Sequence, residues 1–159
     1  LINDKQAAKV KDQIDDALAR GATAVVGGGV EGRFVSPTIL TGVTPDMKVY
    51  REETFGPVVP VIPFRTDEEA IAIANDTEYG LSSGVITRDE NRGLAIAERL
   101  ETGMCHINCS PVNDEPHAPF GGVKSSGVGR YGGRWAMENF TETRWITMDR
   151  GGRPYPPVF

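Results

Sequence analysis

Residues 58–75 read VVPVIPFRTDEEAIAIAN and join two segments of opposite character. The first part, 58–64, is apolar and rich in β-branched residues, which predicts a strand. Its two prolines cannot donate a ladder hydrogen bond, so we expect an edge strand or an irregular pairing. Thr66 follows with Glu69 three residues later, a spacing typical of a capping box. The stretch therefore predicts a strand that leads directly into a helix over 67–76.

The same order of strand and helix recurs once more downstream. Residues 83–87 predict a second strand, and Thr87 with Glu90 forms another Thr-x-x-Glu box, which opens a helix that runs to Glu101. Residues 104–108, MCHIN, predict the next strand. Strands that alternate with helices favour parallel pairing. The sequence therefore predicts an α/β fold with a mostly parallel sheet and flanking helices.

The segments on either side of this alternation carry further periodic patterns. Apolar residues recur at helical spacing over 4–20, which predicts an amphipathic helix capped by Asn3 or Asp4 and ended by Gly21. We also expect a strand at 22–26, an extended segment at 34–40, an irregular connection at 110–133, a short helix at 134–139 and a β-rich strand at 141–148.

The composition excludes several classes of protein. The chain has 159 residues with a formal net charge of -5, and it carries no basic cluster, which argues against nucleic acids and anionic membranes as partners. Two cysteines are too few for a disulfide framework, so a reducing cytoplasm is the expected location. The chain begins Leu1-Ile2-Asn3 without an initiator Met and runs straight into a helix, so we expect a truncated product.

Two stretches match the dinucleotide pattern G-x-G-x-x-G, at Gly27–Gly32 and at Gly127–Gly132. The first follows a predicted strand, but RFVSPTIL comes next and provides no helix N-terminus for a pyrophosphate. The second follows Lys-Ser-Ser and no apolar strand. We interpret both as turns.

Cys105 and Cys109 could be a nucleophile, a metal pair or a disulfide. On one strand they would be separated by roughly 13 Å, at about 3.3 Å per residue, which is too far for a bridge or for shared coordination. His106 is adjacent but would point to the opposite face of the strand. We favour two small hydrophobic residues near a sheet end, and an enzyme that uses Cys109 as its nucleophile stays as a weaker alternative.

A second group of potential ligands lies in the irregular connection. Asp114, Glu115 and His117 fall within four residues. This spacing is a weak metal signal, and we interpret these side chains as polar loop residues. The sequence predicts no metal site.

The corner before the strand at 58–64 poses a different question. Glu52 and Glu53 precede Phe55-Gly56-Pro57. A turn can use Gly56 and Pro57 for its backbone, but it needs neither an adjacent carboxylate nor a phenyl ring.

Four blocks of sequence resemble, in this order, the C-terminal third of the aldehyde dehydrogenase superfamily. The blocks are REETFGPVVPV at 51–61, NDTEYGLSSGV at 75–85, GMCHIN at 103–108 and PFGGVKSSGVGR at 119–130. The resemblance extends from Leu1 to Met148. In that family a thiol attacks an aldehyde, hydride passes to NAD or NADP, and water releases the carboxylate from a thioester.

The resemblance implies a role for the corner. The second acid of the family's Glu-Glu-x-Phe-Gly-Pro motif binds the nicotinamide ribose hydroxyls, and its Phe packs beside the ribose and ring. Those positions are Glu53 and Phe55 here. A carboxylate can accept hydrogen bonds from both hydroxyls of a cis diol, which would orient the cofactor.

The resemblance also implies that this chain is part of a longer enzyme. The family's nucleophilic Cys, general-base Glu, oxyanion-hole Asn and Gly-rich loop all precede the matched region, so we expect no catalytic residue and no activity in this chain alone. Residues 1–140 would be the end of the catalytic domain, 141–150 an oligomerisation strand and 151–159 a tail.

Residues 108–122, which overlap the first part of the irregular connection, correspond to the family's substrate-access loop. The expected substrate-binding residues are Ser110, Pro111, Asn113, Asp114 and Phe120. HIN at 106–108 followed by VNDEPHAPFGGVK at 112–124, with FTETRWIT at 140–147 and RPYP at 153–156, looks most like the branch that oxidises aromatic aldehydes such as benzaldehyde, salicylaldehyde and vanillin.

The strand at 141–148 would pair across subunits, which implies a homodimer or homotetramer. Exposed donors and acceptors on a lone β-rich strand favour such pairing. A binding or assembly module without chemistry, built on the same half-domain, stays as the alternative function.

Overall fold

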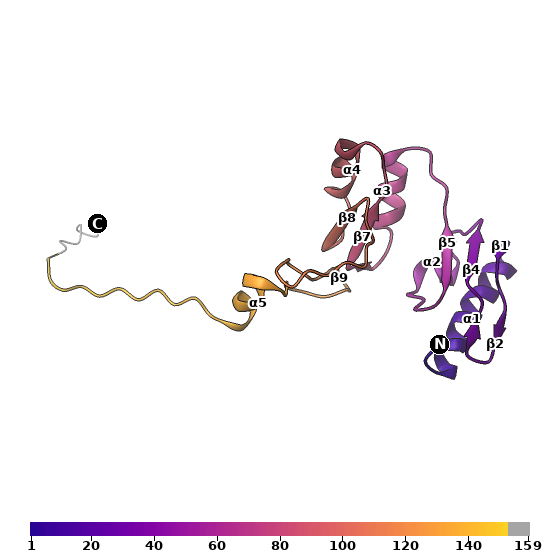
Figure 1. Ribbon diagram of the computed structural model, residues 1–159, viewed down its shortest axis with the longest axis horizontal. Coiled ribbons are helices and arrows are strands. Elements are labelled where there is room, and N and C mark those ends of the chain that lie inside the picture. Colours follow the sequence, from indigo (N-terminus) through magenta and orange to yellow (C-terminus); the bar gives the residue numbers. More distant parts are fainter. Residues whose placement is uncertain (153–159) are drawn as a thin grey trace. The chain divides into compact units, whose positions relative to one another are not determined.

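The computed structural model describes residues 1–152, and the chain divides into two compact units, Leu1–Thr77 and Glu78–Phe159 (Figure 1). The first unit contains α1 (Asp4–Ala19), β1 (Thr23–Val26), β2 (Val30–Glu31), β3 (Phe34–Val35), β4 (Thr38–Thr41), α2 (Lys48–Arg51), β5 (Val58–Val61) and α3 (Asp67–Asn75). The second contains β6 (Tyr79–Gly80), β7 (Ser82–Val85), α4 (Glu90–Ala97), β8 (Met104–Ile107), β9 (Val123–Lys124) and α5 (Gly133–Phe140). Within residues 1–152, no helix is long and apolar enough to cross a membrane.

The first unit is built on a sheet with the order β1-β4-β5. The central strand β4 pairs antiparallel with β1 and parallel with β5, where Leu40 lies opposite Pro60. Strand β5, which contains Pro60 and ends before Pro63, is at the edge of the sheet, one of the two outcomes that the prolines predicted. The expected extended segment at 34–40 is divided at Pro37 between the β2–β3 hairpin and β4.

Helix α1 covers one face of this sheet. Asn3 begins the helix by accepting a hydrogen bond from the Gln6 amide at 2.8 Å, one of the two caps that the sequence allowed. The core of the unit consists of Val10, Ile14, Ala17, Ala22, Leu40, Val43, Met47, Val49 and Val58. The first three lie on one stripe of the helix, so the predicted amphipathic pattern is confirmed.

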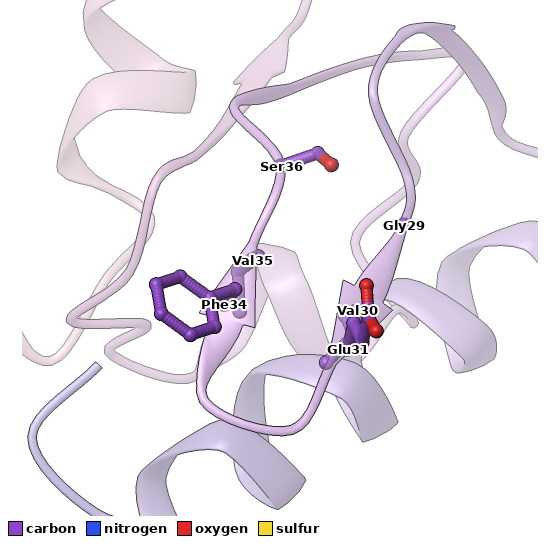
Figure 2. Close-up of a pocket in the computed structure, with 6 residues that line it drawn as sticks. All are labelled: Gly29, Val30, Glu31, Phe34, Val35 and Ser36. Atoms are coloured by element: carbon purple, nitrogen blue, oxygen red, sulfur yellow. The ribbon is translucent and has the colours of Figure 1, made fainter.

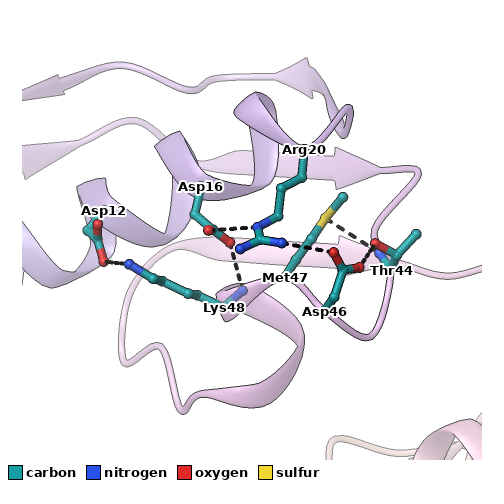
Figure 3. A network of polar contacts seen from close by, with 7 residues as sticks. All are labelled: Asp12, Asp16, Arg20, Thr44, Asp46, Met47 and Lys48. Carbon is teal, nitrogen blue, oxygen red and sulfur yellow. Dashed lines mark hydrogen bonds and ion pairs between the residues drawn. The ribbon is translucent and has the colours of Figure 1, made fainter.

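The short helix α2 is fastened to α1 by a carboxylate (Figure 3). Its N-cap residue, Met47, provides no side-chain cap. Instead, Asp16 of α1 accepts a hydrogen bond from the Lys48 backbone amide at 2.9 Å and another from Arg20 Nε at 2.9 Å. These bonds hold the pKa of the Asp16 carboxyl below its ordinary value, the Lys48 amide having the larger effect and Arg20 the next.

Two further ion pairs extend this contact. Arg20 Nη1 lies 2.9 Å from Asp46 Oδ2, and Lys48 Nζ lies 2.7 Å from Asp12 Oδ2. All four of these side chains are more than 40% exposed, whereas the Asp16 side chain is 12% exposed. Exposed pairs stabilise a fold little, so we expect Asp16 to contribute most to the contact between the helices.

The second unit contains the parallel pair β7–β8, with Ser82 opposite Met104 and Val85 opposite Ile107. Helix α4 packs against both strands. Its Gly93 lies so close to β8 that a Cβ there would be 3.1 Å from Ile107 Cγ2, and 2.9 Å from Cγ2 of Thr87, which follows β7. A glycine at this position therefore lets the helix approach the strands.

The two expected capping boxes have different outcomes. Thr66 accepts a hydrogen bond from the Glu69 amide at 3.2 Å and caps α3, as predicted, but the Glu69 side chain accepts in return from the Arg65 amide at 2.7 Å and not from that of Thr66. The second prediction is wrong, because Asp89 caps α4 by accepting from the Arg92 amide at 3.0 Å. Thr87 instead accepts a hydrogen bond from the backbone amide of Asp89, so it holds the N-cap residue in place.

The α/β class is confirmed, and the strand pairing is mixed. Two ladders, β4–β5 and β7–β8, are parallel, while β1–β4, β2–β3 and β6–β9 are antiparallel. The irregular connection at 110–133 contains the two-residue β9 and is otherwise without helix or strand up to α5.

The predicted strand at 141–148 does not form within this chain. The described residues after α5 belong to no helix or strand, and Trp145 and Ile146 are 89% and 75% exposed. A strand needs a hydrogen-bonded neighbour, and the described residues provide none for this segment. The tail expected at 151–159 lies outside the described residues from 153 onward.

Replacing Asp16 by Ala should lower the melting temperature of this chain at neutral pH, because the Lys48 amide and Arg20 lose their acceptor. The folded-state pKa of Asp16 is depressed, so its contribution is present above the unfolded value of about 3.9 and is lost as the pH falls through the folded value. The difference from wild type should therefore vanish in acid. Thermal unfolding followed by circular dichroism between neutral and acidic pH measures both effects.

Asp15→Ala is the matched control, since Asp15 pairs with Lys11 on the exposed side of the same helix. It should change the melting temperature little. An equal loss in both variants would contradict a special role for Asp16.

Candidate functional site

The corner between α2 and β5 is held by side chains from one face of α1. Gln6 Nε2 donates hydrogen bonds to the Thr54 carbonyl at 2.7 Å and to the Phe55 carbonyl at 3.2 Å. Lys9 Nζ donates to the Glu53 carbonyl at 2.6 Å. Three consecutive carbonyls of an irregular segment thus have partners on a regular helix, which fixes the path of the corner.

The same corner also packs closely against α1. Val10 of α1 is fully buried, and a Cβ added to Gly56 would lie 2.8 Å from Val10 Cγ2. Gly56 therefore allows a close approach between the corner and the helix. Since Gln6, Lys9 and Val10 follow helical i, i+3, i+4 spacing, a single face of α1 makes all these contacts.

Phe55 has an uncommon backbone conformation. Its φ angle is +44°, in the left-handed region that disfavours residues with a side chain, and the residue is 75% exposed. Because the Phe55 carbonyl is held by Gln6, the helix supports this conformation directly. Strained backbone of this kind is common at functional sites.

Glu53 is exposed on the same corner. Within residues 1–152, its backbone carbonyl is bound by Lys9, but its carboxylate has no hydrogen-bonding or ion-pair partner. The corner therefore combines a fixed backbone with a free carboxylate and a free aromatic ring. Such a pair can bind a molecule that carries hydroxyl groups beside a flat ring.

A hollow of about 190 Å³ lies in the second unit, between β8 and the loop that follows it. It is lined by Gly103, Met104, Cys105, His106, Asn113, Asp114, Glu115, Ala118, Pro119 and Phe120. Three of the expected substrate-binding residues, Asn113, Asp114 and Phe120, are thus brought together here.

Ser110 and Pro111 are not among the residues that line this hollow. Ser110 Oγ accepts a hydrogen bond from the Val112 amide at 3.1 Å, and the Pro111 carbonyl accepts one from Ser82 Oγ at 2.6 Å. Both residues shape the start of the loop, and Pro111 fastens it to β7. Their expected contact with substrate stays a prediction.

The sequence did not predict that Cys105 and His106 would both line the hollow. Alternation along a strand placed their side chains on opposite faces, but four consecutive residues of this stretch, 103–106, border the hollow. His106 Nε2 is buried and has no hydrogen-bonding partner among the described residues. Both cysteines are free, Cys109 being exposed, and residues 1–152 contain no cluster that could hold a metal ion.

The two glycine motifs lie in turns and short ladders. Gly27–Gly32 contains β2, the first strand of the β2–β3 hairpin. A hollow of about 360 Å³ at this hairpin is bordered by Gly29, Val30, Glu31, Phe34, Val35 and Ser36 (Figure 2). A hairpin provides no helix N-terminus for a phosphate. Gly127–Gly132 lies between β9 and α5, and β9 pairs antiparallel with β6, so no parallel strand–loop–helix unit is present there.

Comparison with known proteins identifies a family and several similar members. The aldehyde dehydrogenase family matches residues 1–146. A vanillin dehydrogenase of Pseudomonas fluorescens is 48% identical over 98% of this chain, and an NAD(+) benzaldehyde dehydrogenase of Pseudomonas putida is 45% identical over 98%. The chain spans 32% of the length of each of these relatives.

Solved structures of aldehyde dehydrogenases are similar to this chain in both sequence and fold. A salicylaldehyde dehydrogenase of Pseudomonas putida G7, complexed with salicylaldehyde, has a TM-score of 0.91 and 43% identity over 98% of this chain. An aldehyde dehydrogenase of Mycobacterium tuberculosis, complexed with NAD+, has a TM-score of 0.88 and 39% identity over 97%. Each match covers 32% of the solved chain.

Replacing Gly56 by Ala should destabilise the first unit by ~1–3 kcal/mol, the usual cost of overpacking, because the new methyl group meets Val10. Denaturant unfolding of this chain measures the loss. Gly84→Ala is the matched control, since a Cβ there would lie 3.6 Å from its nearest neighbour, an ordinary contact. A Gly56→Ala protein as stable as Gly84→Ala would show that the corner does not pack tightly on α1.

Proposed function

The chain belongs to the aldehyde dehydrogenase family, and we propose that it is the C-terminal third of an enzyme that oxidises an aromatic aldehyde to its carboxylate with NAD or NADP. The corner that presents Glu53 and Phe55 is the observation that carries this proposal. A non-catalytic assembly module would have no use for a free carboxylate beside an exposed ring. NAD appears in the names of two similar proteins, from Pseudomonas putida and Mycobacterium tuberculosis.

The residues of the corner fit a nicotinamide nucleotide. The Glu53 carboxylate has no competing partner in the described residues, so it is available to accept hydrogen bonds from the two ribose hydroxyls. The exposed Phe55 ring offers an apolar surface to the ribose and the nicotinamide. The bound nucleotide would supply the hydride acceptor, and these two residues would fix its orientation.

Orientation is the contribution that we assign to the corner. Transfer between two bound groups is steep in distance and angle, so a small rotation of the acceptor slows the reaction. Gln6 and Lys9 hold the backbone of the corner. Glu53 and Phe55 therefore stay in place, and the acceptor bound to them does not rotate. We propose that the thiol nucleophile and the general base come from the part of the enzyme that precedes the matched region, as the family resemblance implies, and that this chain alone does not catalyse the reaction.

The hollow beside β8 supports an aromatic substrate. Phe120 offers a ring face, while Asn113 and Asp114 offer polar groups at the same hollow. A substituted benzaldehyde combines a flat ring with polar substituents and fits this combination. The relatives named for vanillin, benzaldehyde and salicylaldehyde support the same class of substrate.

The C-terminal segment supports self-association. We propose that residues 141–148 form a strand against another subunit and so build a homodimer or homotetramer. Their side chains and backbone are exposed in the single chain, including Trp145 and Ile146. We also propose a cytoplasmic location, which the two free cysteines favour.

The substrate class is tested with the full-length gene product that contains this chain. We expect NAD- or NADP-dependent oxidation of benzaldehyde, vanillin and salicylaldehyde with a kcat/KM about tenfold or more above that for acetaldehyde, because one buried ring adds several methylene equivalents of contact. Formation of the reduced nucleotide, followed by its absorbance, measures the rates. A marked preference for short aliphatic aldehydes would refute the aromatic proposal.

The assembly is tested by light scattering of the same gene product. The wild type should be a dimer or tetramer. A Thr143→Pro variant should fall to a smaller species, because proline removes a donor from the intersubunit ladder. A wild-type monomer, or an assembly that Thr143→Pro leaves unchanged, would contradict a role for 141–148.

A further inference from the structure

Gln13 is a buried polar residue that the core does not require. Its side chain is fully buried on α1, among apolar neighbours such as Val10, Ile14 and Ala17. Its Oε1 atom has no hydrogen-bonding partner among the described residues. An unpaired amide oxygen lowers the stability of a fold, so an apolar residue of the same length would suit the core better.

The nitrogen of the same side-chain amide does have a partner. Gln13 Nε2 donates a long hydrogen bond of 3.5 Å to Glu52 Oε2. The reverse orientation of the amide would place an oxygen against the carboxylate. The contact with Glu52 therefore determines which way the amide points and leaves Oε1 unpaired.

Glu52 in turn affects its neighbour. The backbone of Glu52 is extended, with φ −100° and ψ 143°. Successive side chains along an extended backbone point to opposite sides. With Glu52 held against α1, the side chain of Glu53 is directed away from the helix, where its carboxylate has no partner within residues 1–152.

We propose that Gln13 is a positioning residue, which holds Glu52 against α1 and thereby directs Glu53 toward the cofactor. This inference rests on the proposed function, because it needs Glu53 to bind a nicotinamide nucleotide. It continues the row of contacts from Gln6 and Lys9, since residue 13 is one further turn along the same face. The helix would thus hold both the backbone and one of the two acids of the corner.

The test uses Gln13→Met in the full-length gene product, because methionine has a similar length and no amide. The kcat/KM for NAD or NADP should fall by about ten- to a hundredfold, the scale of loss for a displaced reacting group. The KM for the aldehyde should stay within about twofold, since the hollow beside β8 is untouched. The melting temperature should be unchanged or higher, because an unpaired buried oxygen is removed.

Two further variants separate this role from a general effect on folding. Ile14→Met, a volume-conserving change at the next buried position of α1, should leave the kinetic constants unchanged. Glu52→Ala, at an exposed position, should reproduce the loss in kcat/KM for the nucleotide, and Gln13→Met should add little to it in the double variant.

Each outcome decides between the proposals. An inactive wild-type gene product would refute the proposed function. An active wild type with normal nucleotide kinetics in Gln13→Met, or in Glu52→Ala where Gln13→Met does not fold, would refute the positioning role alone. Additive losses in the double variant would show that Gln13 does not act through Glu52.

Discussion

The structure of the first unit depends on how α1 meets the corner before β5. The backbone there is neither helix nor strand, so its carbonyls need partners from elsewhere. Gln6 and Lys9 provide them for three consecutive residues, and Gly56 allows the helix to come close. The left-handed backbone conformation of Phe55 is tolerated because these contacts with α1 hold the carbonyls on either side of it in place. The exposed acid and ring are therefore carried by a rigid support, although they lie in a loop.

Helix α1 thus contributes both to the stability of the unit and to the candidate site. Its apolar stripe, which includes Ile14 and Ala17, packs on the sheet and forms the core. The adjoining stripe carries Gln6, Lys9 and Gln13 to the corner, and Val10 belongs to both. The two stripes share a backbone, so the packing of the apolar stripe on the sheet also fixes where the polar stripe lies beside the corner. The proposed positioning role of Gln13 gives a reason for an unpaired amide oxygen in the core of this unit.

The sequence predicted the local elements better than their partners. The helix beginning after Thr66 and the edge position of β5 follow from a hydroxyl cap and from proline's missing donor, both of which act within a few residues. Thr87 failed as a cap because Asp89, two residues later, competes with a stronger acceptor. The antiparallel partner of β4 could not be predicted, because pairing is decided by contacts between distant residues. The strand at 141–148 shows the same limit, since its neighbour does not lie within the described chain.

The candidate site was partly accessible from sequence for a related reason. Glu53 and Phe55 stand out as residues that a turn does not need, and family resemblance gave them a role. The side chains that hold them were missed, because Gln6 and Gln13 read as ordinary polar positions on a helix until the corner is seen beside them. In the second unit, the path of the loop backbone brings Phe120 to the hollow, whereas the Pro111 carbonyl bonds to Ser82 of β7.

A structure of the full-length gene product with its nicotinamide nucleotide tests the central claim most directly. The account predicts the Glu53 carboxylate at hydrogen-bonding distance from the ribose hydroxyls next to the nicotinamide, with Gln6 still bound to the Thr54 carbonyl. A nucleotide bound elsewhere, with Glu53 turned into solvent, would contradict it.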